Sequence, residues 1–266
     1  MDFEKLKAVR CFLLDMDGTI YLGNQLLPGA LAFLEMLEQR GIGYYFLTNN
    51  SSRSSIEYAE KLTRLGIAAG QDRIFTSGEA TAIYLKKQKP GARLFVVGTP
   101  PLESEMRSHG FVLVDSAPDF VVLGFDTTLT YQKLWNLCDF VRAGVPYVAT
   151  HPDFNCPTET GYMPDIGAMI AFVEASTGRR PDQIIGKPHL PIVEAMLAKT
   201  GLAVDQLGMV GDRLYTDIAL GKAGLTTVLV LSGETNLEDL QGSEFTPDYV
   251  MRDLAALLEV FQQMPL

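Results

Sequence analysis

The sequence of 266 residues has few of the side chains that build soft-metal sites and disulfide frameworks. Its three cysteines, Cys11, Cys138 and Cys156, are widely spaced and form no Cys-x-x-Cys pair, and it has only three histidines. A zinc site therefore has few ligands to draw on. Because an odd, sparse set of cysteines is typical of reduced thiols, we expect a cytoplasmic protein.

Long apolar runs and basic clusters are also missing. No apolar run approaches the ~18 residues of a membrane span, and the opening residues MDFEKLKAVR are too charged for a secretory signal. The chain carries 22 basic and 32 acidic side chains, a net charge of −10, with no block of lysine or arginine. We therefore expect a soluble protein that binds neither a membrane nor a nucleic-acid polymer. This charge balance still allows a local cationic pocket.

What the sequence does have is a repeated alternation of short β-rich runs and amphipathic helices. Runs such as AVRCFLL, GYYFLT and TTVLVLSG alternate with helices predicted over residues 28–40, 55–65 and 252–262, and a further helix is predicted to end at Ala223. Strands that are separated by helices pair in parallel through right-handed crossovers. The sequence therefore predicts the α/β class with a Rossmann-like parallel-sheet core.

The middle of the chain has a complete set of elements of its own. The runs ARLFVVG, DFVVLGF and PYVAT predict a second sheet, with helices over residues 131–143 and 166–176 beside it. Polar segments with proline and glycine at 86–91 and 177–182 are typical of linkers. We therefore predict a discontinuous core domain, residues 1–80 and 183–266, and an inserted α/β cap domain, residues 81–182.

Polar side chains follow four predicted strands of the core. They are Asp15 with Asp17, Thr48 with Asn49, Lys187, and Asp212 with Asp217. Because ligands of open parallel sheets bind beyond the carboxyl ends of the strands, we expect these residues to converge. Taken singly, each has an ordinary explanation as a turn residue, a helix cap, a helix-dipole partner or a solvated surface lysine. Their joint occurrence favours one shared site.

The chemistry of such a site follows from its charge. Several carboxylates in one crevice repel one another, and a hard divalent cation with oxygen ligands relieves this repulsion. Magnesium accepts few carboxylates and keeps its waters, which leaves room for a phosphate oxygen. Lys187, Thr48 and backbone N–H groups near Gly18 and Asn49 can hold the other phosphate oxygens.

A general acid alone is too weak a catalyst for this chemistry. Hydrolysis of a phosphate monoester requires accelerations up to about 10²¹-fold, whereas a general acid supplies roughly 10² to 10⁴. We therefore expect a nucleophile, a metal and fixed cationic donors to act together.

Four motifs, DMDGT, LTNN, GKP and GDRLYTD, occur in this order and closely resemble the four motifs of the haloacid dehalogenase (HAD) superfamily. The long insertion between the second and third motifs resembles the α/β cap of the p-nitrophenyl phosphatase or NagD-type branch, subclass IIA. The segment VATHPDFNCPTETGYMPDIGAMIAFVEASTG in this insertion also resembles that cap, so the likeness covers nearly the whole chain. The resemblance implies the HAD fold.

The resemblance also implies a role for each matched residue. Asp15 would be the nucleophile that becomes an aspartyl-phosphate, and Asp17 would be the general acid and base. Thr48 would bind the phosphate, together with Asn49, and Lys187 would clamp its charge.

For the metal, the resemblance implies Mg²⁺ bound by the Asp15 carboxylate, the backbone carbonyl of Asp17, and Asp212. Asp217 would support these ligands without being one of them.

One position departs from the pattern of the branch. His151 stands where the branch usually carries asparagine before Pro-Asp, and this bears on the substrate rather than on the reaction. We predict that His151 and Asp153, in the cap segment THPDFNCP, contact the organic part of the substrate. A structural loop histidine is the alternative for His151.

The sequence therefore predicts a Mg²⁺-dependent phosphatase that hydrolyses small organic phosphate monoesters, such as p-nitrophenyl phosphate, sugar phosphates or nucleoside monophosphates. A dehalogenase also uses an aspartate nucleophile, but it needs neither Asp17 nor Asp212. A phosphate-binding or regulatory HAD-like protein with little turnover is the second candidate function. The expected partner is a small phosphorylated metabolite, and a homo-oligomer is left open.

Overall fold

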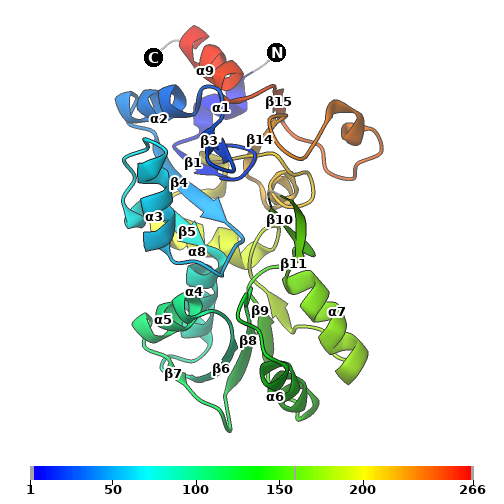
Figure 1. Cartoon of the computed structure of the whole chain (residues 1–266). Helices are drawn as coiled ribbons and strands as arrows, with labels where there is room; N and C mark the ends of the chain where they lie inside the picture. Colours follow the sequence, from blue (N-terminus) through cyan, green and yellow to red (C-terminus); the bar gives the residue numbers. More distant parts are fainter. Residues whose placement is uncertain (1–2, 159, 265–266) are drawn as a thin grey trace. The chain divides into compact units, whose positions relative to one another are not determined.

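The computed structural model describes residues 3–158 and 160–264, and the chain divides into two compact units (Figure 1). The first, here called the core unit, consists of Met1–Leu47, Ala59–Phe75 and Met196–Leu266. The second, here called the middle unit, consists of Thr48–Tyr58 and Thr76–Ala195.

The core unit is built on a six-stranded sheet with the strand order β15-β14-β13-β1-β4-β5. Its strands are β1 (Cys11–Leu14), β4 (Gly43–Thr48), β5 (Ile74–Thr76), β13 (Leu207–Gly211), β14 (Thr226–Val230) and β15 (Tyr249–Met251). The pairings from β15 through β14, β13 and β1 to β4 are parallel. This arrangement confirms the predicted α/β class with a parallel-sheet core.

Helices and a small hairpin complete this part of the chain. The α-helices are α1 (Glu4–Ala8), α2 (Ala30–Gln39) and α9 (Leu254–Gln263), and the hairpin joins β2 (Tyr21–Leu22) to β3 (Gln25–Leu26). Two more helices, α3 (Ser55–Arg64) and α8 (Leu190–Thr200), each begin in residues of the middle unit and end in residues of the core unit. Short 3₁₀ helices are η1 (Gln71–Arg73), η2 (Val204–Gln206), η3 (Ile218–Ala223) and η4 (Leu237–Leu240). The helix expected to end at Ala223 is thus the 3₁₀ helix η3.

The helices α2 and α9 pack against each other and against β1. The rings of Phe12, Phe33 and Phe261 come from these three elements and lie 5.8 to 6.1 Å apart, in edge-to-face contacts. Gly29, with φ 83°, precedes α2, and a Cβ there would lie 2.2 Å from the backbone nitrogen of Ala255. Only glycine permits this close approach, and α2 therefore begins two residues after the predicted start at Pro28.

The middle unit contains a second parallel sheet with the strand order β12-β9-β8-β6-β7. Its strands are β6 (Arg93–Val97), β7 (Val112–Leu113), β8 (Phe120–Leu123), β9 (Tyr147–Ala149) and β12 (Gln183–Ile184). Its helices are α4 (Ser77–Gln88), α5 (Pro100–Ser108), α6 (Tyr131–Arg142) and α7 (Ile166–Thr177). An antiparallel hairpin of β10 (Asn155–Thr158) and β11 (Gly161–Pro164) follows β9. The apolar core lies between this sheet and the paired helices α6 and α7.

The bounds of the two units differ from the predicted domain bounds. The predicted cap spans residues 81–182, whereas the middle unit also contains residues 48–58 and extends to Ala195. The physical reason is a set of side-chain contacts that begins right after β4, in which Asn49 binds the backbone of Lys187. The functional division into core and cap stays a prediction.

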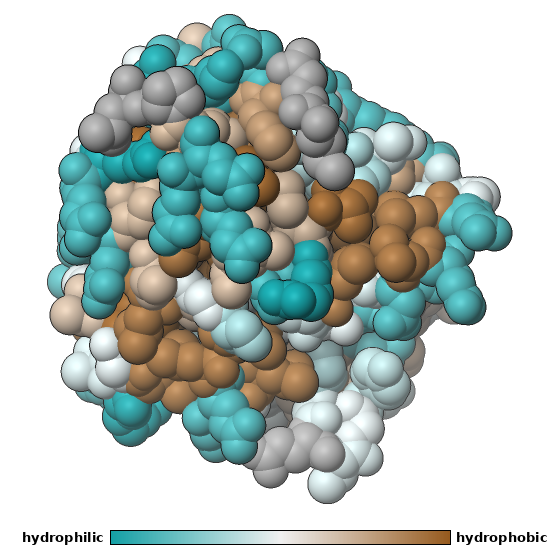
Figure 2. Space-filling view, turned by 90° about the horizontal axis from the view of Figure 1, so that it is seen from above, coloured by the Kyte–Doolittle hydropathy of each residue, from teal (hydrophilic) through white to brown (hydrophobic). Residues whose placement is uncertain are grey.

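Within residues 3–158 and 160–264, no helix combines the length and the apolar character that a membrane crossing requires. On the face shown in Figure 2, hydrophilic side chains alternate with separate hydrophobic patches.

Candidate active site

The first motif forms a tight turn at the carboxyl end of β1. The backbone N–H of Asp15 still pairs with the carbonyl of Val210 on β13, at 2.9 Å. The carbonyl of Met16 then accepts hydrogen bonds from the following turn, and Gly18, with φ 83°, donates its N–H to the carbonyl of Tyr21 at 2.8 Å. Gly18 is required here because other residues rarely adopt this left-handed conformation.

Three aspartates meet at the ends of β1 and β13. Carboxylate oxygens of Asp15, Asp212 and Asp217 lie within 4.8 Å of one another. Asp15 is half-buried, whereas Asp212 and Asp217 are buried. The structure thus brings together residues that are almost two hundred positions apart in the sequence, as the sheet topology predicts.

The carboxylate of Asp212 is held asymmetrically. Its Oδ2 accepts a hydrogen bond from the backbone N–H of Glu234 at 2.7 Å. Its Oδ1 is buried and has no hydrogen-bond partner in the part of the chain that the structure describes. Burial, with the neighbouring charges of Asp15 and Asp217, raises the pKa of Asp212 well above its usual range. A buried cluster of oxygens with one unsatisfied atom fits a hard divalent cation.

Asp17 stands in a different environment. Its side chain keeps contact with solvent and is not part of the three-aspartate cluster. Its pKa is raised because protein atoms displace water from around the carboxylate, and Asp15 adds to this rise. The cation of Lys61, whose Nζ lies 3.7 Å from the centre of the Tyr21 ring, acts in the opposite direction. Two aspartates in the same turn thus have distinct surroundings.

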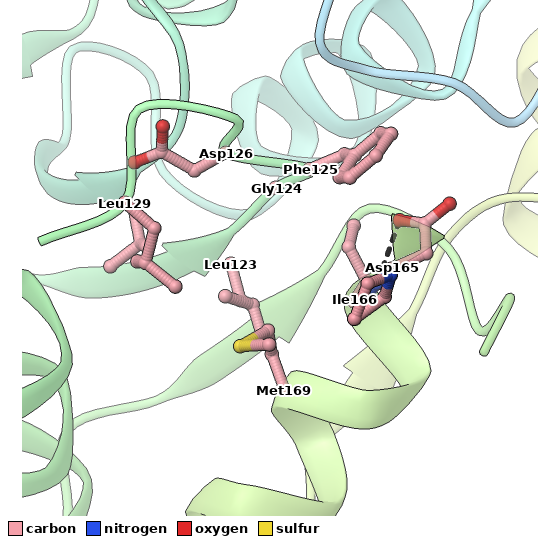
Figure 3. Close-up of a pocket in the computed structure, with 10 residues that line it drawn as sticks. Leu123, Gly124, Phe125, Asp126, Leu129, Asp165, Ile166 and Met169 are labelled. Carbon is pink, nitrogen blue, oxygen red and sulfur yellow. Dashed lines mark hydrogen bonds between the residues drawn. The ribbon is translucent and has the colours of Figure 1, made fainter. Parts of the chain in front are cut away.

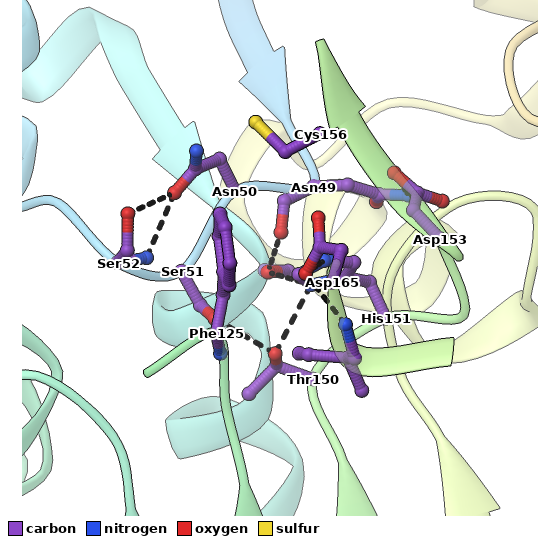
Figure 4. A network of polar contacts seen from close by, with 12 residues as sticks. Asn49, Asn50, Ser51, Ser52, Phe125, Thr150, His151, Asp153, Cys156 and Asp165 are labelled. Carbon is purple, nitrogen blue, oxygen red and sulfur yellow. Dashed lines mark hydrogen bonds and ion pairs between the residues drawn. The ribbon is translucent and has the colours of Figure 1, made fainter. Parts of the chain in front are cut away.

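The second motif ends β4 and continues into the middle unit. Thr48 is buried, and its Oγ1 accepts a hydrogen bond from the N–H of Asn50 at 3.1 Å. The carboxamide of Asn49 binds Lys187: its Oδ1 accepts from the Lys187 N–H at 2.7 Å, and its Nδ2 donates to the Lys187 carbonyl at 2.9 Å. The Asn49 Nδ2 also donates to both carboxylate oxygens of Asp153, at 3.1 and 3.3 Å (Figure 4).

His151 lies at the centre of a buried polar network. Its Nε2 lies 3.0 Å from Oδ1 of Asp165, the residue that caps α7, and its Nδ1 lies 3.1 Å from Oγ1 of Thr150 (Figure 4). The Oγ1 of Thr150 also lies 2.9 Å from Oγ of Ser51. These are the contacts of the structural loop histidine named above as the alternative. A direct contact of His151 with substrate stays a prediction, as does that of half-buried Asp153.

One cavity of the middle unit is too small for an organic substrate. It has a volume of about 30 Å³ and is lined mainly by apolar side chains between β8 and the start of α7, among them Leu123 and Ile166 (Figure 3). Two carboxylates, Asp126 and Asp165, complete its lining, and Asp126 forms an ion pair with Lys133 at 2.5 Å. A volume of this size accommodates about one water molecule.

Sequence reasoning missed the segment Ser232–Thr235, which follows β14. Its backbone contacts Asp212, and the Glu234 carboxylate binds the Nε of Arg213 at 2.9 Å and the hydroxyl of Tyr215 at 2.8 Å. The position of this segment in the sequence could have indicated its place at the site. It follows β14, which lies beside β13, so its residues come at the same edge of the sheet as Asp212.

Comparison with known proteins identifies the family. The acid sugar phosphatase of Staphylococcus aureus (strain MRSA252) is 37% identical over 251 residues, which cover 94% of this chain and 96% of that protein. The model of the haloacid dehalogenase-like hydrolases matches residues 12–112, and a HAD-hydrolase-like model matches residues 184–257. The chain belongs to the haloacid dehalogenase-like hydrolases.

Solved structures agree with this assignment. A 4-nitrophenylphosphatase from Thermotoga maritima superimposes with a TM-score of 0.93 at 47% identity, covering 96% of this chain and 98% of that one. A glycerol phosphate phosphatase from Mycobacterium tuberculosis, solved in complex with calcium, superimposes with a TM-score of 0.88 at 35% identity, covering 95% of this chain and 76% of that one. The predicted p-nitrophenyl phosphatase and NagD-type branch is confirmed, and this HAD hydrolase is a phosphatase.

Proposed function

We propose that this HAD hydrolase is a Mg²⁺-dependent phosphatase that hydrolyses small organic phosphate monoesters through an aspartyl-phosphate. The observation that carries the proposal is the cluster of Asp15, Asp212 and Asp217, in which the buried Oδ1 of Asp212 has no hydrogen-bond partner among the described residues. A cluster of this kind favours a bound cation beside a carboxylate nucleophile.

The metal would be held by the Asp15 carboxylate, the backbone carbonyl of Asp17, and Asp212. When bound, Mg²⁺ would neutralise the carboxylates and the negative charge of the phosphoryl group. Asp217 keeps its neighbours in place, since its Oδ2 accepts the N–H of Arg213 at 3.1 Å. A Cβ on Gly211 would lie 2.2 Å from Cγ of Asp217, so the backbone packs directly on this side chain.

The reaction would use Asp15 and Asp17 in two steps. In the first step Asp15 attacks phosphorus, the ester P–O bond breaks, and Asp17 gives its proton to the leaving oxygen. In the second step the Asp17 carboxylate takes a proton from water, whose oxygen attacks phosphorus and releases Asp15 and inorganic phosphate. The raised pKa of Asp17 suits a group that must carry a proton in the first step.

Three residues would bind the phosphate. Thr48 would use its hydroxyl and Lys187 its ammonium group. The carboxamide of Asn49 is already used on the backbone of Lys187 and on Asp153. We therefore assign the phosphate contact of Asn49 to its backbone N–H.

The organic part of the substrate would be recognised by the cap, residues 81–182, through Asp153 and His151. The relatives named above act on sugar phosphates, 4-nitrophenyl phosphate and glycerol phosphate, and we propose the same class of small monoesters for this chain. We further place the enzyme in the cytoplasm, in keeping with its sparse cysteines, and leave a homo-oligomer open.

The experiment is a phosphate-release assay with the purified protein on a panel of phosphate monoesters, with excess chelator and then with Mg²⁺ restored. We expect turnover only with Mg²⁺ and none for Asp15→Asn. Binding of phosphorylated ligands without release of phosphate would instead support the phosphate-binding or regulatory protein. Full activity in excess chelator would contradict the metal assignment.

A further inference from the structure

The segment Ser232–Thr235, here called the SGET loop, connects two motifs of the candidate site. It follows β14, and Oγ of Ser232 donates a hydrogen bond to the carbonyl of Gly18 at 2.8 Å. The N–H of Glu234 donates to Oδ2 of Asp212 at 2.7 Å, and the N–H of Thr235 donates to the backbone carbonyl of Asp212 at 3.2 Å. The SGET loop thus forms hydrogen bonds both to the turn that carries Asp15 and to Asp212, a second member of the acidic cluster.

Gly233 lies directly against the Asp212 carboxylate. A Cβ on Gly233 would lie 2.0 Å from Oδ2 and 2.5 Å from Cγ of Asp212, closer than any side chain can approach. A Cβ on Gly18 would likewise lie 2.3 Å from the same Oδ2 and 3.0 Å from Cα of Gly233. Two glycines from distant parts of the sequence therefore enclose one carboxylate oxygen, and no larger residue fits at either position without moving it.

This packing determines which oxygen of Asp212 is available. Oδ2 is enclosed by the glycines and occupied by the Glu234 N–H, whereas Oδ1 has no hydrogen-bond partner among the described residues. A carboxylate that is free to rotate could present either oxygen to a metal. In metal sites, hydrogen bonds from neighbouring groups to the ligand side chain normally fix its orientation.

We propose that the SGET loop is a positioning element for the metal: its backbone and Ser232 hold Asp212 so that Oδ1 faces the cation, and tie Asp212 to the turn of Asp15. This inference rests on the proposed Mg²⁺ site. It assigns the effect to the glycine, the serine hydroxyl and the backbone N–H groups rather than to the Glu234 side chain, which binds Arg213 and Tyr215 instead.

The test is isothermal titration calorimetry of Mg²⁺ binding to the full chain, with wild type, Gly233→Ala, Ser232→Ala and two controls. Groups that orient metal ligands typically contribute about 10- to 100-fold in metal affinity. We expect Gly233→Ala to weaken Mg²⁺ binding by at least about 10-fold. Ser232→Ala removes one hydrogen bond, and we expect it to weaken binding by about 3- to 10-fold.

The controls separate positioning from general damage. Gly43→Ala lies in β4, where a Cβ makes only ordinary contacts at 3.5 Å, and we expect unchanged Mg²⁺ affinity. Glu234→Gln keeps the backbone N–H and should stay within about threefold of wild type. If Gly233→Ala does not fold, as judged by circular dichroism, Ser232→Ala carries the test.

The outcomes distinguish this inference from the proposed function. Wild-type affinity in both Gly233→Ala and Ser232→Ala would overturn the role of the loop and leave the Mg²⁺ site standing. A loss of affinity in Glu234→Gln as large as that in Gly233→Ala would also overturn it, because the side chain would then be the cause. Failure of wild type to bind Mg²⁺ at all would overturn the metal assignment and this inference together.

Discussion

The carboxamide of Asn49 pairs with both backbone polar groups of Lys187, accepting from its N–H at 2.7 Å and donating to its carbonyl at 2.9 Å. A Cβ on Gly186 would lie 2.5 Å from Oδ1 of Asn49, so the chain before Lys187 packs against the same side chain. Two hydrogen bonds therefore join the second motif directly to the third. We predict that Asn49 acts on the proposed phosphate site mainly by fixing the backbone from which the Lys187 side chain extends.

This contact predicts the effect of Asn49→Ala. The substitution removes two hydrogen bonds between the Asn49 side chain and the buried backbone of Lys187, which should lower the free energy of unfolding by about 1–3 kcal/mol. A displaced Lys187 should also lower kcat/KM by about 100-fold, since a shift of about 1 Å in a positioned group can have that effect. Chemical denaturation and phosphate release measure the two effects.

The control for this experiment is Asn136→Ala, whose side chain accepts a solvent-exposed hydrogen bond from Gln132 on α6. It should leave both quantities near wild type. An Asn49→Ala protein that is less stable but keeps full kcat/KM would show that the contact is structural only.

A second prediction concerns Asp17 and the leaving group. Asp17→Asn cannot donate a proton to the leaving oxygen, and alkyl phosphates need this proton more than p-nitrophenyl phosphate does. We expect kcat/KM to fall by about 10² to 10⁴ for glycerol or sugar phosphates and clearly less for p-nitrophenyl phosphate. Equal losses for both kinds of ester would argue against the general-acid role.

A third prediction follows from the raised pKa of Asp212. The folded, metal-free protein binds a proton at Asp212 more readily than the unfolded chain, whose aspartates have a pKa of about 3.9. The stability that this proton contributes is present at low pH and is lost as pH rises through the raised pKa of the folded state. Because Mg²⁺ needs the ionised carboxylate, its binding should release a proton and strengthen as pH rises over the same window.

Thermal unfolding with and without Mg²⁺, as a function of pH, measures this linkage. The stabilisation by Mg²⁺ should grow with pH in wild type. Asp212→Asn has no carboxylate to titrate and should show little Mg²⁺ stabilisation at any pH. A stabilisation that is independent of pH in wild type would contradict the assignment of Asp212 as a ligand.

A fourth prediction separates the two cap residues. Asp153→Ala should reorder kcat/KM across a panel of phosphate esters while affecting hydrolysis of the phosphoenzyme much less, because the alcohol has left by then. His151→Ala should in addition lower the free energy of unfolding by about 1–3 kcal/mol, since the buried Asp165 carboxylate loses its contact with the His151 ring and keeps its hydrogen bond from the N–H of Ile166. An unchanged substrate ranking in both variants would place specificity elsewhere, with residues 50–53 the next candidates.

Helices that bury many apolar side chains could be predicted closely. The helices expected over 131–143 and 166–176 are α6 and α7, with ends that differ by one residue. The hairpin of β10 and β11 could not, because its residues are mostly exposed and carry no apolar alternation. Local periodicity reports burial, and a segment with little burial gives little signal.

The candidate site shows the same division. Asp15 and Asp212 could be predicted to meet, because their strands end at one edge of a parallel sheet. The contact of Asn49 with Lys187 and that of Gly233 with Asp212 depend on atomic packing between distant segments. No spacing in the sequence encodes such packing, so the positioning residues emerge only from the structure.

The central claim is that Asp15 becomes phosphorylated during turnover. The most direct measurement is rapid-quench mass spectrometry of wild type and Asp17→Asn, mixed with p-nitrophenyl phosphate and Mg²⁺ and digested under acid conditions. We expect a phosphate adduct on the peptide that contains Asp15, with a higher occupancy in Asp17→Asn because its hydrolysis is slowed, and none in Asp15→Asn. An adduct on another residue, or phosphate release by Asp15→Asn at an appreciable fraction of the wild-type rate, would contradict the account.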